Sequence, residues 1–299
     1  LVGFMIGWAL IRRVARVGIS PMSPALAGDL VLTLAVSVVI GGRLGYVLFY
    51  KISLLWQFTG EVPFWGALAI NDGGMASHGG MIGGIVGCLY FAWRHALPKL
   101  WLGDLMAFAA PWGLGLGRIA NFVNGELIGR TCEPVFPLAV KFPTEMRTWP
   151  LERMRELMGK LHARGEGLLY DRPRRFVEHA IEQTQAGNQT VIDAVRPMLE
   201  PRHPSQLYAA LGEGLIVGLV LLWVWRKPRK PGVVAFTFLI AYGIVRIIDE
   251  LWRRPDTHIG FDWLLGLPIT RGQGLSAAMV VAGMVGLTVV IRRTAEPIG

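Results

Sequence analysis

Long apolar runs, separated by short polar connections, account for most of the chain. A helix that crosses a bilayer needs about 20 mostly apolar residues, and several runs reach that length. The pattern predicts spans at residues 1–11, 26–49, 76–93, 102–123, 207–225, 233–252 and 275–291. We therefore expect an all-α polytopic membrane protein with about seven transmembrane helices. The first run is short and starts at residue 1, so we expect this helix to be truncated.

Composition supports a membrane protein. Hydrophobic residues make up 53% of the 299 residues and charged residues only 17%, against about 25% charged in a typical soluble domain. The net charge of +9 raises the question of nucleic acid, but the basic residues lie in short clusters between apolar runs. That distribution is typical of topology signals at the ends of spans. We therefore expect a lipid bilayer, and no nucleic acid, as a partner.

The basic clusters also predict the orientation. They follow the first, third, fifth and seventh spans, at Arg12, Arg13 and Arg16, at Arg94 and Lys99, at Arg226, Lys227, Arg229 and Lys230, and at Arg292 and Arg293. Short loops rich in Lys and Arg stay on the cytoplasmic side. We therefore expect a cytoplasmic C-terminus.

A long polar stretch at residues 129–202 then falls on the outer side of the membrane. It contains helix-like segments at 151–161 and 176–184, and its many arginines do not contradict the orientation because long domains translocate largely regardless of charge. We interpret residues 1–128 as transmembrane helices 1–4, residues 129–202 as a small extracytoplasmic head domain, and residues 203–299 as transmembrane helices 5–7.

Polar side chains gather at the outer ends of four predicted spans, where ionisable residues are costly and usually functional. The groups are His78, then Arg118, Asn121, Asn124 and Glu126, then His203, Ser205, Gln206 and Tyr208, and finally Tyr242, Arg246, Asp249, Glu250 and Arg253. Two arginines suit a phosphate because guanidinium binds oxyanions bidentately. Carboxylates such as Glu126 and Glu250 can hold the guanidinium groups, and His78 is able to exchange a proton near neutral pH. The sequence thus predicts a site for an anionic phospholipid.

Simpler interpretations remain open for single residues. Arg246 and Glu250, four positions apart, also fit an intrahelical ion pair, and His78 also fits a helix cap. For His203, before Pro and Ser, we favour a helix start. Arg43 either joins the site or extends its side chain outward. The glycines that follow His78 are typical of close helix packing, since they lack the Lys-Ser/Thr of a phosphate-binding loop.

Residues 117–130, GRIANFVNGELIGR, resemble the signature of the bacterial prolipoprotein diacylglyceryl transferases. Similar segments occur in the right order at residues 41–50, 72–80, 202–208 and 242–250. The resemblance covers nearly the whole chain, although the head is long for the family. It implies transfer of the diacylglyceryl group of phosphatidylglycerol to the lipobox cysteine in the signal peptide of a prolipoprotein, with release of glycerol phosphate, at the outer face of the bacterial inner membrane.

The resemblance also implies roles for individual residues. His78, Arg118 and Arg246 match residues needed for activity, and Asn121, Glu126, Gly129, Tyr242 and Glu250 match other functional positions. With the residue chemistry, this predicts catalytic roles for His78, Arg118, Arg246, Glu126, Glu250 and Tyr242, and substrate contacts for Arg118, Asn121, Asn124, Gly129, Arg246 and Arg43. We expect no metal and no cofactor, and no part for Cys88 or Cys132, because the reacting sulfur belongs to the substrate.

Two other classes of function compete with this interpretation. A polytopic transporter for a small anion would place its site near the membrane midplane, often with repeat symmetry, whereas the polar groups here lie near one face and no repeat is evident. A non-catalytic lipid-binding scaffold differs from an enzyme in that replacing His78 would leave its function intact.

Overall fold

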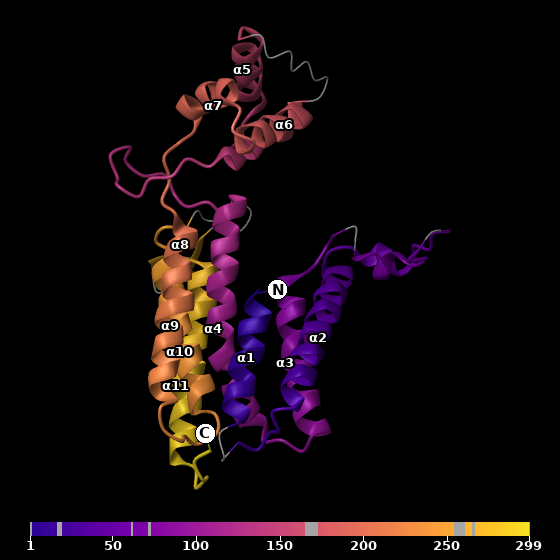
Figure 1. The fold of residues 1–299 in the computed structure, drawn as a ribbon, viewed down its shortest axis with the longest axis vertical. Helices are drawn as coiled ribbons and strands as arrows, with labels where there is room; N and C mark the ends of the chain where they lie inside the picture. The colour runs from indigo at the N-terminus through magenta and orange to yellow at the C-terminus, as the bar shows by residue number, and fades with distance from the viewer. Residues whose placement is uncertain are drawn as a thin grey trace. The chain divides into compact units, whose positions relative to one another are not determined.

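The computed structural model describes residues 2–16, 20–60, 62–70, 73–164, 173–253, 261–264 and 267–298, without the side chains of residues 77, 78, 261–269 and 271. The described part is almost entirely helical (Figure 1). The elements are α1 (Val2–Ala15), α2 (Leu26–Phe49), η1 (Ile52–Leu55), η2 (Gly66–Leu68), α3 (Ser77–Arg94), α4 (Lys99–Asn124), η4 (Pro143–Thr148), α5 (Leu151–His162), α6 (Pro173–Gln185), α7 (Gln189–Val195), η5 (Arg196–Met198), α8 (Ser205–Ala209), η6 (Ala210–Ile216), α9 (Val217–Val224), α10 (Val233–Asp249), β1 (Phe261–Leu264), β2 (Leu267–Thr270) and α11 (Arg271–Arg292).

The helical prediction is confirmed, with one exception in the described residues. β1 and β2 form a two-stranded antiparallel hairpin in which Phe261 pairs with Thr270, where the apolar pattern had predicted no element. The hairpin immediately precedes α11. Its strands have only 4 residues each, which is too short for a periodicity signal.

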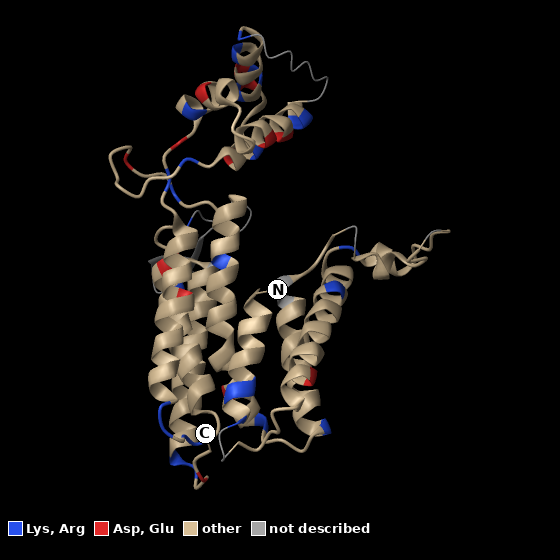
Figure 2. Cartoon of the chain, viewed as in Figure 1, with Lys and Arg blue, Asp and Glu red and all other residues tan. Residues whose placement is uncertain are grey.

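Three helices of the described part are long and apolar enough to cross a membrane, namely Leu26–Phe49, Ser205–Val224 and Gly272–Arg292. The other predicted spans coincide with α1, α3, α4 and α10. α1 with 14 residues and α10 with 17 are short, and α4 is interrupted by Asp104 and Arg118. Figure 2 shows charged residues concentrated near helix ends and in the α5–α7 region.

The chain divides into two compact units. Unit 1 comprises Leu1–Leu114, Leu215–Gly243 and Ala278–Gly299. Its core includes Ile11, Leu30, Phe91, Trp101 and Leu105, from α1 to α4. Helices α2 and α3 approach so closely that a Cβ on Gly45 would lie 2.8 Å from Gly79 Cα, which confirms a packing role for a glycine after His78.

A buried carboxylate joins two helices of unit 1. Asp104 on α4 is only 3% exposed, and its oxygens accept hydrogen bonds from Gly232 N at 2.6 Å and Ala235 N at 2.7 Å. These amides lie at the start of α10, where backbone N–H groups have no partner within the helix. Asp104 therefore caps α10 from a neighbouring helix, which explains a carboxylate inside an apolar run.

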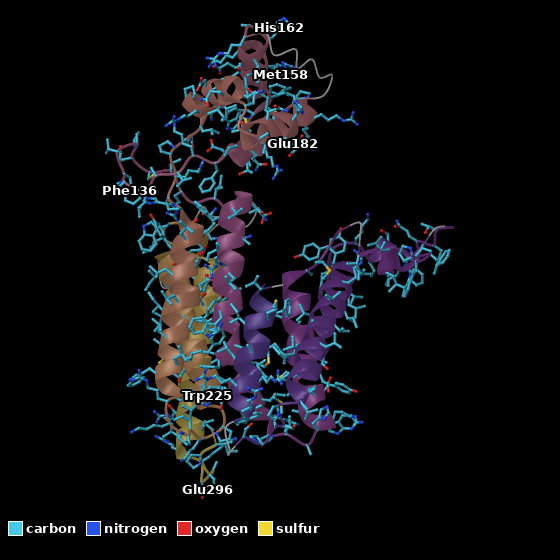
Figure 3. All side chains as sticks on the ribbon, in the orientation of Figure 1. Phe136, Met158, His162, Glu182, Trp225 and Glu296 are labelled. Carbon is cyan, nitrogen blue, oxygen red and sulfur yellow. The ribbon has the colours of Figure 1, made fainter. Side chains whose placement is uncertain are left out.

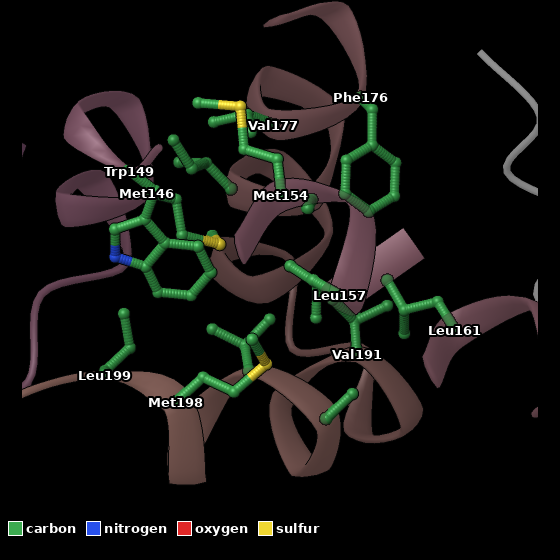
Figure 4. Close-up of a cluster of buried hydrophobic side chains, with 14 residues drawn as sticks. Met146, Trp149, Met154, Leu157, Leu161, Phe176, Val177, Val191, Met198 and Leu199 are labelled. Carbon is green, nitrogen blue, oxygen red and sulfur yellow. The ribbon is translucent and has the colours of Figure 1, made fainter. Parts of the chain in front are cut away.

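Unit 2 comprises Gly115–Gly214 and Ile244–Ala277, and it contains the predicted head. The helix-like segments of the sequence are present as α5 and α6. Together with η4 and α7, they enclose a core in which the side chains point toward one another (Figure 4). Met146, Leu157, Phe176 and Val191 are completely buried there. These amphipathic helices thus share one hydrophobic core, and a separate head domain at residues 129–202 stays a prediction.

Candidate functional site

Two arginines and a glutamate form a buried ion cluster in unit 2. Arg118 on α4 makes a bidentate contact with Glu213, with Nε 3.0 Å from Oε2 and Nη2 3.2 Å from Oε1. Arg246 on α10 reaches the same carboxylate, with Nε 3.6 Å from Glu213 Oε1. Three separate segments thus meet at one carboxylate. The structure brings together the two arginines that the sequence predicted as a phosphate site.

The three side chains differ in exposure. The Glu213 side chain is 0% exposed, whereas Arg118 keeps 19% and Arg246 keeps 15% of its side chain exposed. The carboxylate is therefore covered, while each arginine retains an accessible part. The buried carboxylate offsets the positive charge of the two arginines, and part of each arginine side chain stays accessible beside it.

Sequence reasoning missed Glu213, although a signal for it was present. It is an acidic residue inside the predicted span 207–225, and ionisable residues within spans are usually functional. The other polar groups lie at the outer ends of the predicted spans, whereas Glu213 lies further along its helix.

The backbone around Glu213 is unusual. Residues Ala210–Ile216 form a π-helical segment, η6, within the helix Ser205–Val224. Short π-helical segments often occur at functional sites. Its glycines allow close packing in unit 2: a Cβ on Gly115 would lie 3.0 Å from Gly214 Cα, and a Cβ on Gly212 would lie 2.6 Å from Val245 Cγ1. This close approach lets Glu213 reach both arginines.

Glu250 completes the cluster. Its Oε2 lies 3.5 Å from Arg246 Nη2, and it packs against α11, where a Cβ on Gly272 would lie 3.3 Å from Glu250 Oε1. The intrahelical ion pair considered from the sequence is therefore present. It is not the whole interaction of Arg246, because Glu213 is a second partner.

The loop after α4 carries several of the predicted residues. Gly125 has a φ of +67°, a backbone conformation that glycine adopts without strain. Glu126 accepts a hydrogen bond from Asn121 Nδ2 at 2.9 Å, and its carbonyl accepts one from Gln206 Nε2 at 2.6 Å. Asn124 is exposed at the end of α4. The loop is thus fastened to the start of α8.

Gly129 occupies a position with no room for a side chain. A Cβ there would lie 3.1 Å from both Ser205 Oγ and Trp252 O, and closer still to His203 O. Gly129 also pairs with Arg253 in an isolated β-bridge. These contacts give Gly129 a packing role, and the substrate contact expected from the sequence stays a prediction.

Gly129→Ala is expected to lower the free energy of unfolding by about 1–3 kcal/mol, because the new methyl group meets backbone on two sides. Gly117→Ala is a matched control from the same motif, since nothing lies within 4 Å of a Cβ at that position. Thermal unfolding of the two purified variants checks this. Equal stability of both would contradict the packing role.

A second ion pair, also missed from the sequence, joins the head to this loop. Arg202 Nε lies 2.8 Å from Glu145 Oε2, with side chains 7% and 2% exposed. Arg202 Nη1 also donates to Gly129 O at 3.1 Å. Arg202 belongs to segment 202–208, which resembles the family, but its partner Glu145 lies 57 positions away.

The remaining predicted residues are placed as follows. Arg43, in unit 1, is 5% exposed and donates to the carbonyl oxygens of Gly66, Ala67, Gly73 and Gly74 at 2.6–3.1 Å. These bonds hold Gly66, Ala67, Gly73 and Gly74 against α2, and a substrate contact by Arg43 stays a prediction. His78 is the second residue of α3, and its side chain lies outside the described part. Tyr242, in unit 1, stacks on Phe238 with ring centroids 5.3 Å apart.

His203 is held among aromatic side chains. Its Nδ1 lies 3.4 Å from Tyr208 Oη, and its ring packs edge-on against Phe136 at 4.8 Å, in the loop between α4 and η4 (Figure 3). This fits the structural role favoured from the sequence. The pKa of the Cys132 thiol is raised, mainly by burial and secondly by the negative charge of the nearby Glu133. The environment of Cys132 therefore does not activate it as a nucleophile. Among the described residues, no group of three or more His, Cys, Asp or Glu side chains is arranged to hold a metal ion.

Comparison with known proteins gives a consistent result. The family model for prolipoprotein diacylglyceryl transferase matches residues 1–289. The phosphatidylglycerol–prolipoprotein diacylglyceryl transferase of Bdellovibrio bacteriovorus is 44% identical, over 99% of this chain and 88% of its own length. Proteins of the same name from Rhodospirillum centenum and Escherichia coli are 38% and 37% identical, over 100% and 99% of this chain and 86% and 88% of their own lengths. The chain therefore belongs to the prolipoprotein diacylglyceryl transferase family and is a membrane transferase with several spans.

Proposed function

We propose that this protein transfers the diacylglyceryl group of phosphatidylglycerol to the lipobox cysteine of prolipoproteins. The observation that carries the proposal is the pair Arg118 and Arg246 on one buried carboxylate, Glu213, in a chain of this family. The names of its relatives specify both substrates. The phosphate of an anionic phospholipid needs cationic side chains at the membrane to bind it. Arg118 and Arg246 are partly exposed and supply these cations.

The reaction replaces a phosphate ester bond with a thioether. The cysteine sulfur attacks the glyceryl carbon that carries the phosphate, the carbon–oxygen bond breaks, and its electron pair stays on the phosphate oxygen. Glycerol phosphate leaves, and the thiol proton passes to a base. Arg118 and Arg246 stabilise the charge that develops on the phosphate, which is the step where fixed cations have most effect.

Other residues assist in this scheme. His78 accepts the thiol proton or orients the lipid, and Glu213 and Glu250 hold the guanidinium groups. Tyr242 and Glu126 also belong to the catalytic group. The substrate is contacted by Asn121, Asn124, Gly129 and Arg43, or by the backbone that these residues position. Asn121, Asn124 and Gly129 belong to the end of α4 and the loop after it, and Arg43 holds the backbone at Gly66 and Gly73. The thiolate needed for attack is further favoured by the cationic surroundings.

The same proposal includes a topology. Seven transmembrane helices, corresponding to α1, α2, α3, α4, the helix Ser205–Val224, α10 and α11, place the basic clusters and the C-terminus in the cytoplasm. The head and the arginine cluster then face the periplasmic side, where signal-peptide lipoboxes are presented.

The test is incubation of the purified protein with phosphatidylglycerol and a lipobox peptide, followed by mass spectrometry. The peptide is expected to gain one diacylglyceryl group on its cysteine, and a peptide with serine there is expected to gain none. Cys88→Ser and Cys132→Ser proteins serve as controls and are expected to retain turnover. No mass gain by the folded wild-type protein would refute the proposed function.

A further inference from the structure

A small cavity lies beside the arginine cluster, entirely within unit 2. It has a volume of about 20 Å³ and is lined by Arg118, Leu127, Ser205, Gln206, Ala209, Arg246, Asp249 and Arg253. That volume accommodates a single water-sized group. The two arginines that form the phosphate site therefore share this cavity with polar side chains that have no part in the function proposed above.

Two of these side chains are buried and carry an acceptor without a partner. Gln206 is 2% exposed and Asp249 is 7% exposed. Within the described part of the chain, Gln206 Oε1 and Asp249 Oδ2 have no hydrogen-bond partner. The amide orientation of Gln206 is fixed, because its Nε2 donates to Glu126 O at 2.6 Å. Leaving a buried acceptor without a hydrogen bond is unfavourable, so the pair is expected to serve a ligand.

The chemistry of the pair defines that ligand. Both atoms accept hydrogen bonds when Asp249 is ionised, so the ligand must donate, and the cavity limits the inserted group to about one hydroxyl. The arginines that line the same cavity, Arg118, Arg246 and Arg253, favour a ligand whose remaining part carries an anion. A phosphate with a hydroxyl a few bonds away meets both conditions. The glycerol headgroup of phosphatidylglycerol is such a structure.

We propose that Asp249 and Gln206 form a subsite that accepts a hydrogen bond from a headgroup hydroxyl, and that Asp249 thereby selects a polyol headgroup over other anionic phospholipids. The subsite rests on the proposed function, because its ligand is the donor lipid of that reaction. Asp249 lies on α10 three residues after Arg246, so the two side chains share one helix face. Phosphate and hydroxyl recognition thus come from the same face of one helix.

The absence of a side chain at Gly212 leaves room beside Asp249. A Cβ on Gly212 would lie 3.6 Å from both carboxylate oxygens of Asp249. The π-helical segment that carries Gly212 also carries Glu213. The π-helical segment therefore brings the Glu213 carboxylate to the two arginines and also leaves space beside Asp249.

The experiment compares two lipids that have the same charge at phosphate. Phosphatidylglycerol carries headgroup hydroxyls, and phosphatidylpropanol carries none. The full-length protein in detergent is assayed with each lipid and a lipobox peptide, and the ratio of the two kcat/KM values is measured. The wild-type ratio is expected to favour phosphatidylglycerol about tenfold to hundredfold, since a hydrogen bond to a charged group contributes about 1.5–3 kcal/mol.

Asp249→Ala is expected to bring the ratio close to one, by slowing the reaction with phosphatidylglycerol and leaving that with phosphatidylpropanol nearly unchanged. Asp249→Asn, which has the same size, is expected to move the ratio in the same direction and provides the answer if the alanine variant does not fold. Glu152→Ala, an exposed carboxylate in the head, is the control and is expected to keep the wild-type ratio.

Three outcomes would overturn the subsite. A wild-type ratio near one would mean that the cavity holds water only. Equal loss with both lipids in the Asp249 variants would mean that Asp249 supports the fold only, and a ratio unchanged by either variant would exclude Asp249 from selection. These outcomes differ from failure of the proposed function, in which the wild-type protein transfers the diacylglyceryl group from neither lipid.

Discussion

Alanine at Arg246 is expected to lower the rate of diacylglyceryl transfer by on the order of 10³-fold, while the protein remains folded in membranes. Arg246 and Arg118 share the carboxylate of Glu213, so loss of one guanidinium removes half of the positive charge that faces the leaving phosphate. Arg118→Ala is expected to have a comparable effect. Initial rates with phosphatidylglycerol and a lipobox peptide measure both.

Two comparisons make this result specific. Arg246→Lys keeps the charge but not the planar pair of donors, and we expect it to recover only a part of the lost rate. Arg147→Ala removes an arginine of the head that pairs with Glu178 at 2.7 Å, and we expect the wild-type rate. Full activity of Arg246→Ala would remove the arginine pair from the mechanism.

Replacement of Glu213 by alanine is expected to destabilise the protein by about 3–5 kcal/mol and to abolish transfer. Removal of one partner of a buried ion pair leaves uncompensated buried charge, and here two arginines depend on one carboxylate that is 0% exposed. Glu213→Gln retains the shape and an acceptor oxygen, so we expect a smaller loss of stability but still a large loss of rate. Denaturation in detergent and the transfer assay measure the two effects separately.

The chain contains a matched exposed pair for this comparison. Arg147 and Glu178 are each 50% exposed, and exposed ion pairs contribute about 0–1 kcal/mol. Glu178→Gln is therefore expected to change stability little and the transfer rate not at all. If Glu213→Gln behaves like Glu178→Gln in both measurements, the proposed role of Glu213 in holding the two arginines is wrong.

Much of the fold follows from apolar runs, because burial in lipid forces the backbone to form its hydrogen bonds within helices. The runs predicted at 26–49, 102–123 and 233–252 correspond to α2, α4 and α10. The family assignment, drawn from ordered motifs, is confirmed. The π-helical segment escaped prediction, because a single widened turn leaves the apolar pattern of the helix almost unchanged.

The contacts within the site were less accessible to sequence reasoning. Arg118 and Glu213 are 95 positions apart, and their pairing depends on how closely glycines let the helices approach. The spacing along one helix predicts that Arg246 and Glu250 form an ion pair. It does not predict that Arg246 also contacts Glu213 on another helix. Arg43 shows the converse: a motif flagged it for the substrate, whereas its described hydrogen bonds go to the backbone carbonyls of Gly66, Ala67, Gly73 and Gly74.

The most direct measurement of the central claim counts the leaving group. Phosphatidylglycerol labelled in its headgroup is incubated with the purified protein and a lipobox peptide, and released glycerol phosphate is compared with thioether formed. The account predicts one glycerol phosphate for each diacylglyceryl thioether, and a rate of formation of both products that falls on the order of 10³-fold with Arg246→Ala. Transfer of an acyl chain with release of a lysophospholipid, or thioether formation at the wild-type rate by Arg246→Ala, would contradict it.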